Sequence, residues 1–372
     1  MRTSTLSVLF ATVALAGGAS AGEPYRWSVM NLNGDSALGS IAWDVDDSTA
    51  VGQAAWDGQY TAAKWVAGSG QPQALASPPG FARALGVHSG SIVGFTGFAI
   101  SRAVVWTGGT LTDLNPADGL DSTANAVWHS NQVGSVFRAG SNHAALWAGS
   151  AGSFVDLHPL GAADSGISDI DGSGQAGTVY WTQPGAMHAA LWHGTADSVV
   201  DLHPAGAYAS QAQAISNGRQ GGYAQFVRDG PSHAALWSAT AESFFDLTPS
   251  GGPTVAGAIY GMDGDVQVGQ AGFLDGSGGA TVWFGTPESA FFLGSLLSAD
   301  YTETWAYAVD IDKFGTIRVV GYAYNNNYYL PDGTYYPRNE AMMWVLVPEP
   351  SSLAALAAGL AGLAALRPRR RR

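Results

Sequence analysis

The sequence predicts an all-β protein, a seven-bladed β-propeller whose last blade is closed by the N-terminal strand. Three observations predict this fold: a motif that recurs about every 45 residues, seven copies of that motif, and a last copy that lacks one strand, which the N-terminus can supply. The composition agrees, because 50 glycines among 372 residues and a hydrophobic content of 46 % favour packed strands joined by tight turns.

The motif is clearest in three nearly identical segments. Residues 143–147, 188–192 and 233–237 all read His-Ala-Ala-Leu-Trp and lie 45 residues apart, and Asp-Leu-x-Pro begins nine residues after each tryptophan. Weaker copies bring the number of equivalent tryptophans to seven, each with an alanine three residues earlier. These tryptophans are Trp65, Trp106, Trp147, Trp192, Trp237, Trp283 and Trp344. A repeat of this length is typical of a propeller blade.

Each copy predicts four short strands. The first is apolar and ends in a hairpin turn such as Asn217-Gly218, and the second carries a small or β-branched residue followed by glycine, such as Val133-Gly134. The third ends in Ala-x-x-Trp and the fourth holds Asp-Leu. Because the third strand is apolar on both faces, it needs a neighbouring blade on each side. We therefore expect the seven tryptophans to be buried structural anchors that pack against the small alanines.

The two ends of the repeat region predict how the ring closes. The last copy has its third strand at 341–344 but no Asp-Leu strand after it, whereas residues 25–32 near the N-terminus end in Asn-Leu. We expect these two segments to pair, which would close the ring non-covalently and hide a sheet edge. An open array of β units or a pair of sandwiches is the alternative.

Both termini are predicted to be targeting segments outside the repeat domain, which spans residues 22–347. Residues 1–21 contain an apolar stretch and end in Ala-Ser-Ala, which is typical of a secretory signal peptide. At the other end, Pro348, Glu349 and Pro350 precede 14 apolar residues at 353–366 and an arginine-rich end at 367–372. That apolar run is shorter than the roughly 20 residues of a comfortable transmembrane helix.

Residues 348–372 resemble the PEP-CTERM sorting signal of Gram-negative bacteria. Pro348, Glu349 and Pro350 match its motif, residues 353–366 its helix and residues 367–372 its basic end. The resemblance implies transient anchoring in the inner membrane, processing by an exosortase and placement at the cell surface, outer membrane or extracellular matrix, together with exopolysaccharide production. A plain tail anchor is the alternative.

The repeats themselves are similar to the HAF family of extracellular repeats. Residues 143–147, 188–192 and 233–237 match it best, whereas Thr61 and Arg102 replace the histidine in outer copies. The resemblance implies an extracellular repeat protein and names no reaction. Residues 22–347 hold 10 Lys and Arg against 28 Asp and Glu, a net charge near −18, which disfavours nucleic acid and anionic lipid as partners.

The recurring polar residues are expected to be structural. A catalytic or metal site needs unlike residues that converge, whereas His143, His188 and His233 would occupy equivalent places on successive blades. We expect them to hold a turn or strand through hydrogen bonds to the backbone. The aspartate of Asp-Leu is expected to cap the turn that follows it. It occurs as Asp113, Asp156, Asp201 and Asp246.

Two features are candidate binding sites. Acidic turns at 44–47, 169–174, 263–265 and 310–312 could hold Ca²⁺, although none has the full EF-hand pattern and a plain hairpin turn is the alternative; no cofactor is otherwise predicted. The second feature is an insertion at 322–338, which is the candidate ligand-binding loop because exposed Tyr and Asn suit sugars and protein surfaces. Its candidate residues are Asn325, Asn327, Tyr328, Tyr329, Tyr335 and Tyr336.

The sequence carries no motif of a known enzyme class. It has no cysteine, no Gly-x-Ser-x-Gly, no phosphate-binding loop and no His-Glu-x-x-His. We therefore expect a non-catalytic surface or matrix protein that binds polysaccharide or protein through its loops. Two alternatives stay open: a polysaccharide-active hydrolase or lyase, whose paired carboxylates would be distant in sequence, and a structural protein without a ligand.

Overall fold

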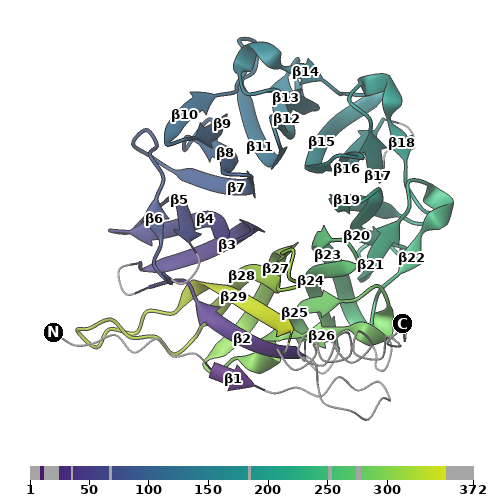
Figure 1. The fold of residues 1–372 in the computed structure, drawn as a ribbon. Coiled ribbons are helices and arrows are strands. Elements are labelled where there is room, and N and C mark those ends of the chain that lie inside the picture. The colour runs from purple at the N-terminus through teal and green to yellow at the C-terminus, as the bar shows by residue number, and fades with distance from the viewer. Residues whose placement is uncertain are drawn as a thin grey trace, which may run out of the picture.

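The chain forms a ring of seven antiparallel sheets around a central axis, shown along that axis in Figure 1. The structure is a computed structural model, and it describes residues 9–11, 25–34, 37–66, 69–182, 186–249, 254–273 and 278–348. Seven sheets around one axis are the blades of a propeller, so the predicted fold is confirmed.

The first three blades each contain four strands, and chain order runs from the axis to the rim. Blade 1 consists of β3 (Gly39–Asp46), β4 (Thr49–Trp56), β5 (Gln59–Val66) and β6 (Gln73–Ala74). Blade 2 consists of β7 (Ala82–His88), β8 (Ser91–Thr96), β9 (Arg102–Thr107) and β10 (Thr110–Asp113). Blade 3 consists of β11 (Asp121–Trp128), β12 (Asn131–Arg138), β13 (Ser141–Trp147) and β14 (Val155–Asp156).

Blades 4 to 6 repeat this plan. Blade 4 consists of β15 (Ala162–Asp171), β16 (Gly174–Trp181), β17 (Met187–Trp192) and β18 (Val200–Asp201). Blade 5 consists of β19 (Ala209–Ser216), β20 (Arg219–Gln225), β21 (Ser232–Trp237) and β22 (Phe245–Asp246). Blade 6 consists of β23 (Thr254–Asp263), β24 (Val266–Phe273), β25 (Gly278–Trp283) and β26 (Phe291–Phe292).

Five short 3₁₀ helices lie in the described connections between strands. They are η1 (Ala151–Ser153), η2 (Ala196–Ser198), η3 (Ala241–Ser243), η4 (Pro287–Ser289) and η5 (Leu293–Leu296).

Blade 7 joins the two ends of the chain. It consists of β27 (Tyr301–Ile311), β28 (Ile317–Asn325), β29 (Arg338–Pro348) and β2 (Tyr25–Asn31). β2 runs antiparallel to β29, with Tyr25 opposite Pro348 and Asn31 opposite Met342, so the predicted closure by the N-terminal strand is confirmed. A further short strand, β1 (Leu9–Ala11), pairs with the outer edge of β2 and lies within the predicted signal peptide.

The seven repeat tryptophans hold neighbouring blades together. All seven are 0–3 % exposed. Each shares a hydrophobic cluster with the preceding blade, and each cluster contains the alanine that lies three residues before the tryptophan of that blade. Trp192, for example, packs in one cluster with Ala144, and Trp344 packs in one cluster with Ala280. The expected packing of indole against methyl is therefore present at every seam between blades.

A β-bulge in each innermost strand explains the glycine of the second strand. In blade 3, Ala124 pairs with Gly134 and Ala126 with Val133, which leaves Asn125 as the extra residue. The carbonyl oxygen of Thr123 then lies 1.9 Å from the place where a Cβ of residue 134 would be. Only glycine fits beside that carbonyl. The same approach, at 1.8–2.1 Å, occurs in all seven blades, at Gly52, Gly94, Gly134, Gly177, Gly222, Gly269 and Gly321.

The ring has two distinct faces because its strands alternate in direction. The turns between strands 1 and 2 and between strands 3 and 4 lie on one face, which we call the acidic face after Asp46, Asp171, Asp263 and Asp310. The connections between strands 2 and 3, and those from blade to blade, lie on the other, which we call the loop face. Since β2 begins and β29 ends at the Tyr25–Pro348 pair, both chain ends leave from the acidic face.

Candidate functional site

A cavity of about 610 Å³ occupies the axis of the ring and opens on the acidic face. Its wall is built from the extra residue of each β-bulge, which turns its side chain toward the axis. We call these seven half-buried side chains the bulge residues: Trp43, Leu85, Asn125, Ser168, Gln213, Tyr260 and Tyr307. The repeat thus places one variable side chain from each blade around the same axis.

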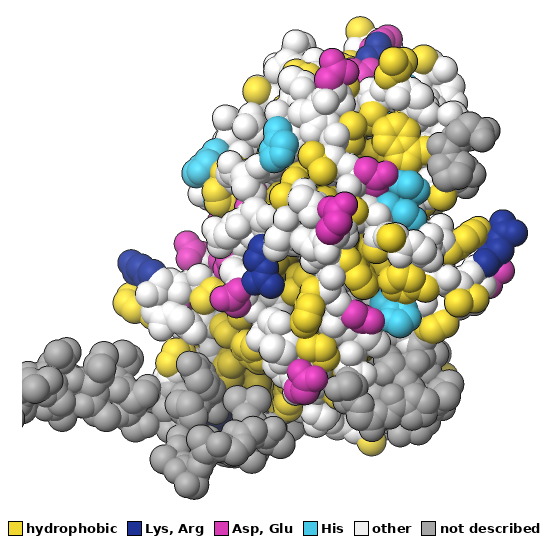
Figure 2. All heavy atoms as spheres, turned by 90° about the vertical axis from the view of Figure 1, so that its right-hand side faces the viewer, with side chains coloured by type: hydrophobic (Ala, Val, Ile, Leu, Met, Phe, Trp, Pro, Cys, Tyr) yellow, Lys and Arg dark blue, Asp and Glu magenta, His cyan; other side chains and the backbone are white. Residues whose placement is uncertain are grey.

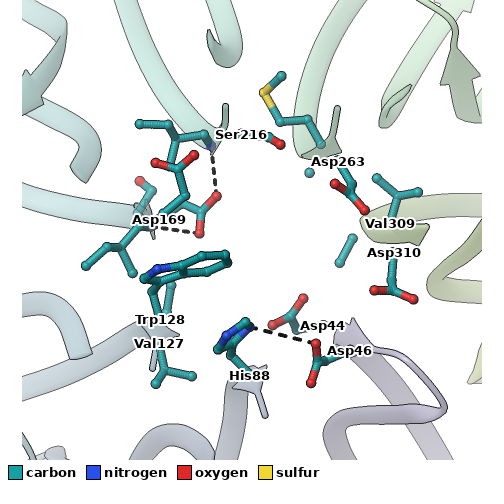
Figure 3. Close-up of a pocket in the computed structure, with 18 of the residues that line it drawn as sticks. Asp44, Asp46, His88, Val127, Trp128, Asp169, Ser216, Asp263, Val309 and Asp310 are labelled. Carbon is teal, nitrogen blue, oxygen red and sulfur yellow. Dashed lines mark hydrogen bonds and ion pairs between the residues drawn. The ribbon is translucent and has the colours of Figure 1, made fainter. Parts of the chain in front are cut away.

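A second ring of side chains surrounds the opening of the cavity. These mouth residues lie three positions after the bulge residues, and they are Asp46, His88, Trp128, Asp171, Ser216, Asp263 and Asp310. Figure 3 shows Trp128 lying across the opening beside His88, with Asp44 and Asp46 on the other side of His88. The acidic turns that the sequence singled out therefore meet at one place, although they are distant in sequence.

Most of these acidic residues fasten one blade to the next. Asp46 accepts a hydrogen bond from the backbone N–H of Ser89 at 2.7 Å, and Asp171 accepts one from Asn217 at 2.7 Å. Three further pairs of neighbouring blades are joined by equivalent hydrogen bonds, in which a backbone N–H of one blade donates to a side chain of the blade before it. These bonds run from Gly264 to Ser216, from Ile311 to Asp263 and from Asp47 to Asp310. The acidic turns thus serve as inter-blade hydrogen bonds, which neither the calcium hypothesis nor the hairpin alternative anticipated.

Blades 2 and 3 interrupt this ring of clips. Their mouth residues, His88 and Trp128, are not carboxylates, and their rings stack with centroids 4.3 Å apart. Burial lowers the pKa of His88, which favours the neutral imidazole. In blades 2 and 3, the mouth residues are therefore a stacked pair of aromatic rings, whereas in the five other blades they accept hydrogen bonds from backbone N–H groups.

Asp44 and Asp169 are further departures from the repeat. Each follows a bulge residue, at a position that is glycine or alanine in the other five blades. Each accepts hydrogen bonds from its own following N–H and from the next blade, at 2.7 Å from Val87 and 2.8 Å from Ile215. Burial raises the pKa of Asp44 to about 8 and that of Asp169 to about 7, although these bonds favour the charged carboxylate.

The cavity also contains polar atoms without partners. Within the part of the chain that the structure describes, Trp43 Nε1 and His88 Nε2 are shielded from solvent and make no hydrogen bond, whereas Asp310 Oδ2, which also makes none, lies 3.6 Å from the Arg318 guanidinium. Among the same residues, no group of three or more His, Asp or Glu side chains is arranged to hold a metal ion.

The histidines of the motif bind the aspartates of the fourth strand. The Nδ1 atoms of His143, His188 and His233 lie 2.8 Å from a carboxylate oxygen of Asp156, Asp201 and Asp246. The prediction that these histidines bond to the backbone was wrong. The third and fourth strands are adjacent, and this places the aspartate of the fourth strand within hydrogen-bonding distance of the histidine. In blade 2, Arg102 makes the same contact with Asp113.

The aspartates cap the following turn, as predicted. The backbone N–H of His158, for example, donates to Asp156 at 2.9 Å. Burial alone would raise the pKa of Asp156, but the N–H of His158 and the His143 side chain outweigh it and hold the pKa below its usual value.

The insertion is shorter than predicted. Residues 322–325 continue β28 and Arg338 begins β29, because Tyr322 pairs with Ala341 and Asn325 with Arg338, which leaves residues 326–337 as the inserted loop. Figure 1 shows the end of the β28–β29 hairpin reaching outward past blade 1.

Only part of the candidate loop is free to bind. Asn325 bonds to Glu340, Asn327 to Asp300, and the ring of Tyr328 lies 3.4 Å below the Arg338 guanidinium. Three tyrosines remain exposed, and they are Tyr329, Tyr335 and Tyr336.

The fold and the C-terminus together define the class of protein, an exported propeller with a sorting signal. Residues 346–371 match the PEP-CTERM protein-sorting motif, which indicates export, a membrane-anchored C-terminal signal and processing by an exosortase. Pro348 is the last described residue, and Glu349 and Pro350 lie outside the described part of the chain. Within that part, no helix is long and apolar enough to cross a membrane. The resemblance to HAF repeats stays a prediction.

Comparisons with solved structures find distant similarities. No curated protein matches the chain. The chain is similar to the β-propeller domain of the Trilobed protease from Pyrococcus furiosus, with 10 % identity, a TM-score of 0.48, and coverage of 81 % of this chain and 93 % of that one. It is similar to a GH74 xyloglucanase from Xanthomonas campestris, with 14 % identity, a TM-score of 0.48, and coverage of 85 % and 55 %.

TolB from Acinetobacter baumannii is a further similar structure, with 14 % identity, a TM-score of 0.42, and coverage of 55 % of this chain and 52 % of that one. The chain thus spans about half the length of the xyloglucanase and of TolB. With TM-scores below 0.5, these similarities carry no argument about function.

Proposed function

We propose that the protein is a non-catalytic binding protein of the cell surface or extracellular matrix, and that it contacts polysaccharide or another protein through its loop face. The PEP-CTERM match supports the location, since it indicates export and surface sorting. The predicted signal peptide at 1–21 would direct the same export.

The observation that carries the binding proposal is the uneven distribution of exposed apolar side chains. Nine of the fifteen large hydrophobic residues that are exposed in the described ranges lie in loop-face connections. These are Phe98, Ile100, Leu120, Leu160, Tyr208, Val227, Tyr329, Tyr335 and Tyr336. Among the turns of the acidic face, Phe314 is the single such residue in those ranges. These side chains come from several blades, and their concentration on one face supports an interaction surface there.

The charge of the protein restricts which class of partner can bind. The repeat domain is strongly acidic, and Figure 2 shows few Lys and Arg side chains on the rim at blades 4 and 5. An anionic polymer would therefore be repelled over a large part of the surface. Neutral polysaccharide, or a protein with an apolar or basic surface, fits the loop face better.

An exopolysaccharide pull-down and a glycan array with the purified protein test this proposal. We expect retention that is lost when residues 326–337 are replaced by a short Gly-Ser turn. The control is Phe314→Ser, which removes an exposed ring from the opposite face and should leave retention unchanged. No retention under any condition would favour a purely structural surface protein instead.

A hydrolase or lyase acting on polysaccharide is the second candidate function. One observation favours it: Asp44 and Asp169 depart from the repeat, face the same cavity and have strongly raised pKa values. Their hydrogen bonds to the backbone account for them as structural clips, so we rank this function second. Release of reducing ends from a polysaccharide by the wild type, and its loss in Asp44→Asn and Asp169→Asn, would reverse that order.

A further inference from the structure

The axial cavity has two unlike halves. The bulge residues of blades 6, 7, 1 and 2 are aromatic or aliphatic, and the rings of Tyr260, Tyr307 and Trp43 form a continuous series with centroids 5.7 and 4.3 Å apart. The bulge residues of blades 3, 4 and 5 are Asn125, Ser168 and Gln213. A ligand on the axis therefore meets an apolar wall on one side and amide and hydroxyl groups on the other.

The polar half has hydrogen-bonding capacity that the protein does not use. Among the described residues, the side chains of Ser168 and Gln213 have no hydrogen-bond partner, and the carbonyl oxygen of the Asn125 amide is likewise unused, while its nitrogen donates to Ile167 at 2.7 Å. On the apolar side, the indole N–H of Trp43 is buried without an acceptor. Buried polar groups normally have partners, so the indole N–H of Trp43 is available to a ligand acceptor, while the half-buried polar groups of Ser168, Gln213 and Asn125 face the cavity, where a ligand could bond to them.

The charge of the cavity selects against anions. Asp44, Asp46, Asp169, Asp171, Asp263 and Asp310 all line it. Their oxygens are largely engaged by backbone N–H groups, so they do not converge on one point as ligands of a cation would. A neutral molecule with many hydroxyl groups can still accept or donate at their free lone pairs.

We propose that this cavity binds an uncharged sugar, as a short oligosaccharide or the end of a neutral polysaccharide chain. A pyranose ring has an apolar C–H face, which packs on tyrosine and tryptophan rings, and hydroxyl groups at its edge, which bond to amide, hydroxyl and carboxyl groups. The volume of about 610 Å³ is that of a small-molecule site. Trp128, stacked on His88 in the opening, would contact the outermost sugar unit.

This site is separate from the loop face, so it extends the proposed function without depending on it. The two sites lie at opposite ends of the ring. A neutral polymer could be held at the loop face alone, in the cavity alone, or at both, and each case is distinguished by variants that change one face only.

Saturation-transfer NMR with the purified full chain tests the proposal. The probes are maltose, cellobiose, lactose and chitobiose, with glucuronic acid and spermidine as charged comparators. We expect at least one disaccharide to bind and both charged probes to bind more weakly. Trp128→Ala should weaken binding roughly tenfold through loss of ring contact, and Gln213→Ala about fivefold through loss of a hydrogen bond.

Gln213→Ala is the safer of the two variants, because that side chain makes no hydrogen bond within the described protein and its loss should not affect folding. The replacement of 326–337 is the control and should leave disaccharide binding unchanged. Absence of saturation transfer from all four disaccharides would overturn the proposal. So would tighter binding of spermidine or glucuronic acid, or unchanged binding in both cavity variants. Polymer retention that survives the cavity variants but fails without 326–337 would support the loop face alone.

Discussion

A disulfide across the closure strand should lock the ring. Ser28 in β2 and Val345 in β29 are directly opposite each other, half-buried, and 317 positions apart in the chain. The protein has no cysteine, so Ser28→Cys with Val345→Cys can form only one intramolecular bond. Opposite residues in an antiparallel pair have Cα atoms about 4.5–5.5 Å apart, which suits a disulfide.

The expected gain follows from the length of the closed loop. In the chain-entropy model, a loop of this size removes roughly 6 kcal/mol of denatured-state freedom at 25 °C, and measured gains are about 2–4 kcal/mol. We therefore expect the oxidised double variant to unfold at a clearly higher urea concentration than the same protein after reduction. Non-reducing electrophoresis and mass spectrometry would verify the single cross-link.

The control pairs Ser28→Cys with Thr110→Cys, which lies at the rim of blade 2 and is separated from blade 7 by the whole of blade 1. That pair should stay reduced or give intermolecular dimers. Free thiols in the Ser28–Val345 variant after mild oxidation, or equal cross-linking in both variants, would refute the pairing of β2 with β29.

Three further predictions concern the packing and charge of the ring. Gly134→Ala should destabilise the fold by several kcal/mol or prevent folding, since its Cβ would meet the Thr123 carbonyl, whereas Gly152→Ala has open space and should have little effect on the urea midpoint. Burial raises the folded-state pKa of Asp44 above its unfolded value of 3.8, so the folded protein binds this proton more tightly than the unfolded chain does. The free energy of unfolding should therefore fall by about 1.4 kcal/mol per pH unit as the pH rises between roughly pH 5 and 7. Asp44→Asn should flatten this pH dependence in denaturation curves, and an unchanged slope would contradict the assignment. His188→Ala should cost about 1–3 kcal/mol, because it removes a buried ring that stacks on His203, whereas its partner Asp201 is partly exposed and stays solvated; circular dichroism melting should show the shift.

The architecture could be predicted because the packing between blades requires particular residue types at fixed positions. Burial of a large indole against a small methyl repeats at every seam, so Trp and Ala recur in the sequence at a fixed spacing. The closing strand was predictable for the same reason, since Asn31-Leu32 is a copy of the fourth-strand motif. Burial constrains residue identity, and the constraint is visible without coordinates.

The cavity could not be predicted because its wall varies from blade to blade. The bulge adds one residue to each first strand, and Trp43, Asn125 and Gln213 occupy that place without any shared chemistry. An alignment of the seven repeats would have shown one variable column two positions before a recurrent β-branched or apolar residue. That signal locates the channel, but the direction in which a bulged side chain points follows only from the backbone.

The partners of the polar residues were also beyond the sequence. The acidic turns looked like local hairpin features or ion ligands, yet Asp46 and Asp171 bond to N–H groups more than 40 positions away, in the next blade. The predicted bounds of the inserted loop were too wide for a related reason. Asn325 is polar, which suggested a loop, but it pairs with Arg338 and so belongs to strand β28.

The Tyr25–Pro348 pair places the point where the sorting signal joins the propeller on the acidic face. The cavity opens on that same face. A molecule still held by its C-terminal signal is therefore attached on the side of the ring that carries the cavity mouth, and exosortase cleavage would remove the attachment from that side.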